Sequence, residues 1–209
     1  MINDKCKICR RVGQKLFLKG ERCFSAKCAM VKRAYPPGLE KKRKTGAPSA
    51  YKRALNEKQK LRNWYGLSER QFKQYVQKTL EKRGKVADIE QDLISKLERR
   101  LDSVVFYLGL AKSRAQAKQL VSHGCFLVNG KPVDIPSYET KKGDVIALKE
   151  TKKKKAIFQE IAAQIKNKEI PKWLELDINK LVAKIKEEPL LAEVAPPAEI
   201  PIIFEFYSR

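Results

Sequence analysis

Four cysteines near the N-terminus constrain the fold of this chain more than any other feature. Cys6 and Cys9 form a C-x2-C pair, thirteen residues intervene, and Cys23 and Cys28 form a C-x4-C pair. Two short chelate loops let four thiolates approach one ion tetrahedrally, which suits a closed structural Zn²⁺ site, whereas catalytic zinc usually keeps a position open for water. Iron–sulfur clusters also take thiolate ligands, and a disulfide pair or free thiols are the remaining interpretations. We expect residues 1–34 to form a tetracysteine metal knuckle that serves as a clip and not as an active centre.

Basic residues outnumber acidic ones by 46 to 24, and the excess lies toward the N-terminus. Residues 1–60 carry 18 Lys and Arg against 4 Asp and Glu, whereas residues 156–209 carry 7 against 9. This gradient creates a strong positive field at one end and predicts a polyanionic partner, most commonly nucleic acid. The chain has no apolar run of the ~20 residues that span a bilayer and does not begin with a signal-peptide stretch. We therefore expect a cytoplasmic protein without a membrane partner, whose cysteines stay reduced or bind metal.

The chain between the cysteines and its middle is predicted to be a connector followed by helices. Three prolines and a lysine-rich run favour an extended basic connector over 35–50. Helical spacing predicts one helix over 50–65 and a second that begins at Ser68 with a capping box. A third helix is expected to begin at Asp88 and to continue as one apolar stripe that stops at Gly109.

A compact α+β module is predicted next, over residues 96–152. A capping box and a closing glycine bound a helix over 113–124. Alternating apolar residues then flank Asn129–Gly130, a strong hairpin signal, and 143–149 is a third strand candidate. A basic run and an amphipathic linking helix are expected over 153–166. The segment that follows is ambiguous between helix and strand.

The residues of this module carry a family resemblance. KLERRLDSVVFYLGLAKSRAQAKQLVSHGCFLVNGKPVDIPSYETKKGDVIAL (96–148) closely resembles the RNA-binding domain named after small-subunit ribosomal protein S-four. The cysteines, YPPG, EKQKLRNWYGLSERQF, IPKWLELD and the terminal FEFYSR resemble the bacterial S-four family in its cysteine-containing form. The resemblance covers nearly the whole chain and implies an α+β fold. A helical domain of 51–95 would be completed by 167–209, and the module would be inserted between them.

This resemblance also implies a function. A protein of this kind would be a structural constituent of the small ribosomal subunit that binds a multi-helix junction in the 5′ domain of 16S rRNA. It would nucleate assembly of the subunit body and contribute to translational accuracy, with S-five, S-three and the channel through which mRNA enters as neighbours. Two departures from the family pattern stand out. LEKKRKTG replaces the usual QHG after YPPG, and the divergent segment 178–201 places Pro201 in what is normally a terminal helix.

Two other functions compete with this one. An RNA-modifying enzyme can carry the same module, and a zinc-knuckle regulator can bind RNA or DNA transiently. Against an enzyme, no catalytic domain remains, the chain shows no glycine-rich cofactor loop or nucleophile–base pair, and its single histidine restricts acid–base chemistry. We predict a protein that is not an enzyme and has no small-molecule substrate.

RNA junctions are recognised through shape, phosphates and unstacked bases, which requires well-placed cations. Arg114 and Lys118 are four residues apart, so we expect both on one outward helix face. Adjacent arginines at 99 and 100 could instead pair with nearby acidic residues, and His123 could be a helix C-terminal cation. Cys125 is expected to be a small buried hydrophobe. The aromatic residues between 64 and 75 could stack on bases, but their helical spacing favours core packing for most of them. The predicted RNA-binding residues are Arg10, Arg11, Arg43, Lys44, Lys52, Arg53, Lys58, Arg62, Arg99, Arg100, Arg114, Lys118, Gln119, His123 and Lys131.

Overall fold

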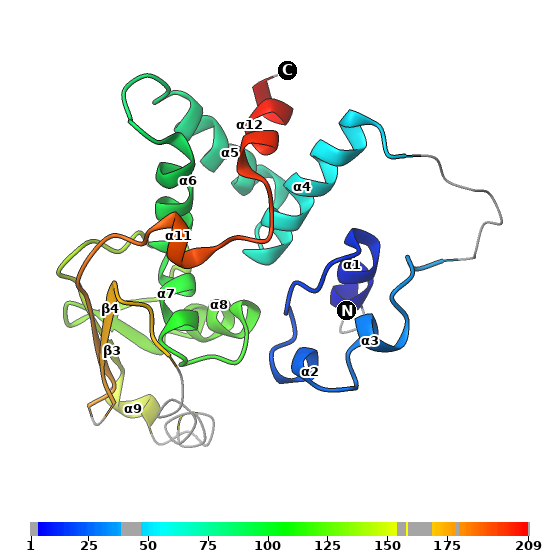
Figure 1. The fold of residues 1–209 in the computed structure, drawn as a ribbon. Coiled ribbons are helices and arrows are strands. Elements are labelled where there is room, and N and C mark those ends of the chain that lie inside the picture. Colours follow the sequence, from blue (N-terminus) through cyan, green and yellow to red (C-terminus); the bar gives the residue numbers. More distant parts are fainter. Residues whose placement is uncertain (1–3, 39–46, 154–157, 159–168, 179, 209) are drawn as a thin grey trace. The chain divides into compact units, whose positions relative to one another are not determined.

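The structure is a computed structural model, shown in Figure 1, in which the chain forms two compact units. The first unit comprises Met1–Glu90 and Ala195–Arg209, and the second comprises Gln91–Val194. Half of the predicted basic connector, residues 39–46, and most of the predicted linking helix over 153–166 fall outside the described residues. The residues that the structure describes are 4–38, 47–153, 158, 169–178 and 180–208.

The cysteine-rich beginning of the first unit consists of three short helices joined by loops. They are α1 (Asp4–Val12), α2 (Glu21–Phe24) and α3 (Ala29–Lys32). Its small interior contains Leu16, which is 2% exposed, together with three of the four cysteines. Because so few apolar side chains are buried here, the cysteines are a large part of what holds these turns together.

The rest of the first unit is helical. Helix α4 (Ala50–Trp64) begins after Ser49, whose side chain accepts a hydrogen bond from the backbone N–H of Lys52. Helix α5 (Glu69–Leu80) has the predicted reciprocal capping box between Ser68 and Gln71, which confirms that prediction. These caps satisfy backbone donors that the first turn of a helix would otherwise leave without partners.

The C-terminal helix α12 (Ile200–Ser208) packs against both α4 and α5 (Figure 1). Ile203 and Phe72 are fully buried in this helical unit. Pro201 lies in the first turn of α12, where its missing N–H removes no internal helical hydrogen bond. The departure from the family pattern at this position is therefore compatible with a terminal helix.

The predicted single helix from Asp88 to Gly109 is wrong, because the chain breaks in its middle. Two helices form instead, α6 (Ile89–Glu98) and α7 (Leu101–Tyr107). Arg100 is extended and forms an isolated bridge with Glu139, while the N–H of Leu101 donates to the carbonyl of Tyr138 at 2.9 Å. A distant loop thus takes the hydrogen bonds that a continuous helix would have used.

The second unit places α7 and α8 (Arg114–Ser122) beside a five-stranded antiparallel sheet of order β2-β1-β3-β5-β4. Asn129 and Gly130 have φ values of 50° and 77° and form the predicted hairpin turn, with Val128 opposite Lys131. Two further short helices are α9 (Glu150–Lys153) and α11 (Leu191–Val194). The strands are β1 (Phe126–Val128), β2 (Lys131–Val133), β3 (Val145–Leu148), β4 (Leu174–Asp177) and β5 (Val182–Ile185).

The ambiguous segment after the linking helix is a strand pair. The expectation that residues 167–209 as a whole complete the helical domain is therefore wrong, because β4 and β5 belong to the sheet of the second unit. Trp173 and Ile185, each 2% exposed, join a core that includes α7, α8 and the sheet. Burial of this apolar surface accounts for the location of the strand pair.

The predicted α+β class is correct, and several expected core residues are buried. Cys125 is 1% exposed in the second unit, as predicted for a small buried hydrophobe. Tyr65 and Phe72 are buried in the first unit, whereas Trp64 and Tyr75 are half-buried. None of the described helices is both long and apolar enough to cross a membrane.

Candidate nucleic-acid interface and cysteine cluster

The four cysteines line one small cavity of about 10 Å³ in the first unit. Cys9, Cys23 and Cys28 are buried, and the backbone N–H of Lys19 donates to Cys23 Sγ at 3.4 Å. Burial raises the pKa of the Cys9 thiol, and the three neighbouring cysteines act in the same direction. All five cysteines are free thiols in the described structure, which leaves these sulfurs available as ligands.

The cavity fits a metal by donor type and by charge, although its ligand geometry is not formed. Within the described ranges, no group of three or more His, Cys, Asp or Glu side chains is arranged to hold an ion. Lys19 Nζ is buried without a hydrogen-bond partner among the described residues, and Lys5 lines the same cavity. A buried ammonium needs a counter-charge. Four thiolates around a divalent ion carry a net charge of about −2 and would supply it.

Arg114 does not point outward, so the expectation of an exposed guanidinium at this position is wrong. Its side chain is 10% exposed and forms an ion pair with Glu98, which is fully buried, at 3.1 Å. The guanidinium also donates to the hydroxyls of Ser103 at 3.0 Å and Tyr107 at 3.1 Å. It lies 4.9 Å above the ring of Phe106. A buried carboxylate needs a cation, and Arg114 pairs with this one.

Arg99 and Arg100 are also engaged with carboxylates, and the predicted pairing with a nearby acidic residue holds for Arg100 only, because the partners of Arg99 are distant in the chain. Arg100 is 2% exposed and donates to both carboxylate oxygens of Asp102, at 3.0 and 2.6 Å. Arg99 forms ion pairs with Glu139 and, at 3.3 Å, with Glu188. Arg100 is thus buried and paired with Asp102 inside the second unit, and its charge does not lie at the surface.

Lys58 and Arg62 connect the helices of the first unit. Both pair with Glu69, at 2.7 and 2.9 Å, and Tyr207 donates to the same carboxylate at 2.8 Å. Burial alone would raise the pKa of Glu69, but these hydrogen bonds together lower it. Lys58 Nζ also lies 4.7 Å from the ring centroid of Phe206. The two cations thus tie α4 to α5 and α12.

The remaining predicted contacts divide by exposure. Lys118 is half-buried, and Arg10 is held by a hydrogen bond from its Nε to the carbonyl of Tyr35 at 2.9 Å. Arg43 and Lys44 lie outside the described residues. The predicted RNA-binding side chains that the structure leaves exposed are Arg11, Lys52, Arg53, Gln119, His123 and Lys131.

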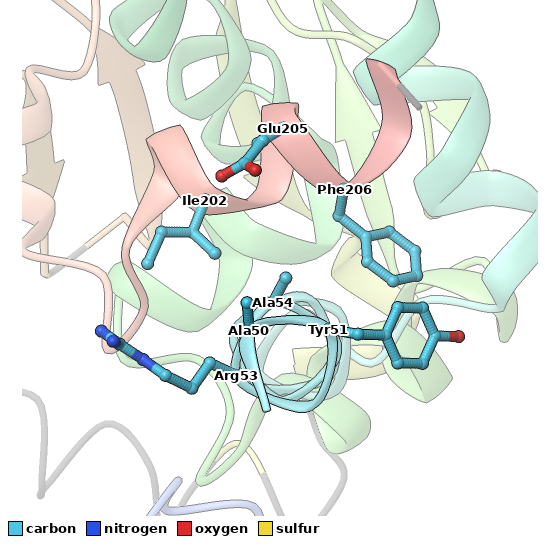
Figure 2. A pocket seen from close by; sticks show the side chains of 7 residues that line it. All are labelled: Ala50, Tyr51, Arg53, Ala54, Ile202, Glu205 and Phe206. Atoms are coloured by element: carbon cyan, nitrogen blue, oxygen red, sulfur yellow. The ribbon is translucent and has the colours of Figure 1, made fainter. Parts of the chain in front are cut away.

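A pocket of about 400 Å³ lies between α4 and α12 in the first unit, and sequence reasoning did not predict it (Figure 2). The rings of Tyr51 and Phe206 border it with centroids 5.7 Å apart. Ile202 adds an apolar wall, and Arg53 and Glu205 add charged groups (Figure 2). The only signal in the sequence was Tyr51, an aromatic residue in the first turn of a polar helix.

Two family models match this chain, and together they cover residues 1–146. Residues 1–102 match the family described as Ribosomal protein S4/S9 N-terminal domain. Residues 99–146 match the S4 domain, so the helix pair and hairpin belong to an RNA-binding module.

Relatives that match this chain over nearly their whole length share one name. Small ribosomal subunit protein uS4 of Thermus thermophilus is 43% identical over 208 residues, which cover 100% of this chain and 98% of the relative. The protein of that name from Caldicellulosiruptor saccharolyticus is 45% identical over 208 residues, with the same coverage. That from Halothermothrix orenii is 44% identical over 204 residues, which cover 98% of this chain and 96% of the relative. The chain belongs to the uS4 family of small ribosomal subunit proteins.

This membership confirms the family resemblance and two further predictions. The chain is a structural ribosomal protein and not an enzyme, and its place is the small ribosomal subunit. An RNA-modifying enzyme built on the same module is thereby excluded.

Proposed function

We propose that this protein recognises a multi-helix junction in the 5′ domain of 16S rRNA. Through that contact it nucleates assembly of the small-subunit body and contributes to translational accuracy. The observation that carries the proposal is 43% identity over 208 residues to a small ribosomal subunit protein, together with an S4 domain at residues 99–146. The formal charge of +22 supports a polyanionic partner.

Binding to RNA tests this proposal directly. The protein is titrated with a transcript of the 16S 5′ domain, against a size-matched structured RNA, at several salt concentrations. We expect a preference for the 5′ domain that persists as salt rises, because junction shape is recognised in addition to phosphate charge. Equal affinities that fall together with salt would reduce the interaction to a general positive field and refute the proposal.

The exposed residues of the S4 domain are the favoured RNA contacts in the second unit. Gln119, His123 and Lys131 are exposed, and Lys118 is half-buried on the same helix as Gln119. A phosphate contact by a lysine should contribute to affinity and to its salt dependence. Lys131→Ala is therefore expected to weaken binding and to lower the slope of log K against log salt by about one. An unchanged slope would remove Lys131 from the interface.

Zn²⁺ bound by Cys6, Cys9, Cys23 and Cys28 is part of the proposed architecture. The buried Lys19 ammonium without a hydrogen-bond partner among the described residues supports an anionic thiolate centre beside it. Elemental analysis of protein purified without chelator should give about one zinc per chain. An iron–sulfur cluster would instead give iron, sulfide and visible absorption, and protein that contains neither metal would refute the site.

Protein neighbours complete the proposal. The S-five and S-three proteins are expected to lie next to this one in the assembled subunit, close to the channel through which mRNA enters. The pocket bordered by Tyr51 and Phe206 offers an apolar surface for an adjacent protein (Figure 2). Cross-linking of assembled subunits, followed by mass spectrometry, should recover these two neighbours, and their absence would refute the assignment.

A further inference from the structure

An exposed pair of stacked aromatic rings lies in the cysteine-rich part of the first unit. Phe24 is 75% exposed and Phe17 is 43% exposed. Their ring centroids are 4.9 Å apart with an interplanar angle of 29°. Phenylalanine normally gains stability by burial, so a pair that leaves most of one ring in solvent indicates a surface with a partner.

The backbone holds both rings outward. Each follows a buried residue, since Leu16 is 2% exposed and Cys23 is 7% exposed. Phe17 has a φ of 53°, in the left-handed region that is costly for a bulky side chain. Such strain persists only where the surrounding structure fixes it, and it is concentrated where ligands are held. The buried neighbours Leu16 and Cys23 thus hold the two rings at the surface, and the exposure of the rings does not come from a loose loop.

The surroundings of the pair are strongly basic. Residues 4–33 contain ten Lys and Arg against two Asp and Glu. Lys15 Nζ lies 5.3 Å from the ring centroid of Phe17. Arg22 and Lys27, on either side of Phe24 in the chain, are both exposed. An apolar protein partner would gain nothing from this charge, whereas a nucleotide offers a flat base for the ring and a phosphate for the cations.

We propose that Phe24, supported by Phe17, is a stacking platform for one unpaired base of an RNA. Lys15, Arg22 and Lys27 attract the phosphates of the nucleotides next to that base. This inference deepens the proposed function and rests on RNA being the partner. It adds a contact that reads an unstacked base, which phosphate contacts by lysine and arginine cannot provide.

Substitution at Phe24 tests the platform in the full-length, metal-loaded protein. Base–aromatic stacking contributes enough that Phe24→Ala should weaken binding of the 16S 5′ domain transcript by about five- to a hundredfold. Phe24→Tyr keeps a stacking ring and should retain affinity, whereas Phe24→Leu keeps an apolar side chain and should not. Val31→Ala is the matched control, because Val31 is 64% exposed in the same part of the chain. Its affinity should equal that of the wild type.

Photocrosslinking gives a second, direct measurement. Irradiation of the complex at short ultraviolet wavelength joins stacked bases to aromatic side chains without a linker. After RNase and trypsin digestion, mass spectrometry should find a nucleotide adduct on the tryptic peptide 23–27, which contains Phe24. The adduct should disappear in Phe24→Leu.

The outcomes separate this inference from the proposed function. If the wild type does not prefer the 5′ domain, the proposed function fails, and the platform is then decided by Phe24→Ala on a single-stranded oligonucleotide. If the wild type prefers the 5′ domain but Phe24→Ala binds equally well and no adduct forms, the platform is overturned while the proposed function stands. In that case the aromatic pair faces a protein neighbour.

Discussion

Replacing Arg114 by alanine should destabilise the second unit more than it affects RNA contacts directly. The guanidinium forms an ion pair with Glu98, whose side chain is fully buried, and it also donates to the hydroxyls of Ser103 and Tyr107. Removing one partner of a buried ion pair leaves an uncompensated charge and costs about 3–5 kcal/mol. We expect Arg114→Ala to lose stability in that range.

The assay is equilibrium unfolding in urea, followed by tryptophan fluorescence. Trp173 belongs to the core of the second unit and lies 6.0 Å, between ring centroids, from Tyr107. In a Trp64→Phe background it is the single tryptophan and reports on this unit alone. Lys118→Ala, four residues further along α8, is the matched control and should change stability by less than about 1 kcal/mol.

A second variant isolates the ion pair from other losses. Glu98→Gln in the Arg114→Ala background removes the buried charge, so it should recover about 2 kcal/mol of the lost stability. The interpretation is refuted if Arg114→Ala unfolds like the wild type and instead weakens RNA binding as much as Lys131→Ala. That result would mean that the guanidinium faces RNA, as the helix periodicity alone predicted.

Three further perturbations follow from the structure. The pKa of Glu69 in the folded protein is lowered from its ordinary value of 4.5. The ionised carboxylate therefore contributes stability above pH 4.5, and this contribution is lost as the pH falls through the lowered pKa of the folded state. Glu69→Gln should therefore flatten the loss of melting temperature as pH falls below 4.5, and an unchanged acid limb would contradict the hydrogen-bonded arrangement. Gly130→Ala meets nothing within 4 Å but retains a φ of +77°, so backbone strain alone should cost about 1 kcal/mol in urea unfolding. Cys9→Ser should increase proteolysis within residues 4–32 while the Trp173 transition persists; loss of both together would refute independent units.

The sequence correctly predicts the structural features that depend on residues close together in the chain. The capping box at Ser68 and the Asn129–Gly130 hairpin each involve residues within a few positions of one another. The break between α6 and α7 was not predictable in this way. It depends on hydrogen bonds to Tyr138 and Thr140, about forty residues further along the chain. An uninterrupted apolar stripe does not show that a distant loop will form hydrogen bonds with the backbone in the middle of that stripe.

The same distinction explains which site residues were placed correctly. Helix periodicity assigns a side chain to one face of the helix, but it does not show whether a buried carboxylate will form an ion pair with that side chain. Glu98 lies four residues after the fully buried Ile94, so its position on the apolar face was the available signal that a cation would have to turn inward. Because Arg114 pairs with the buried Glu98, its charge stabilises the core of the S4 domain. Recognition of RNA then depends on the cations that are not paired with an acidic residue, and on any surface aromatic group that can stack on a base.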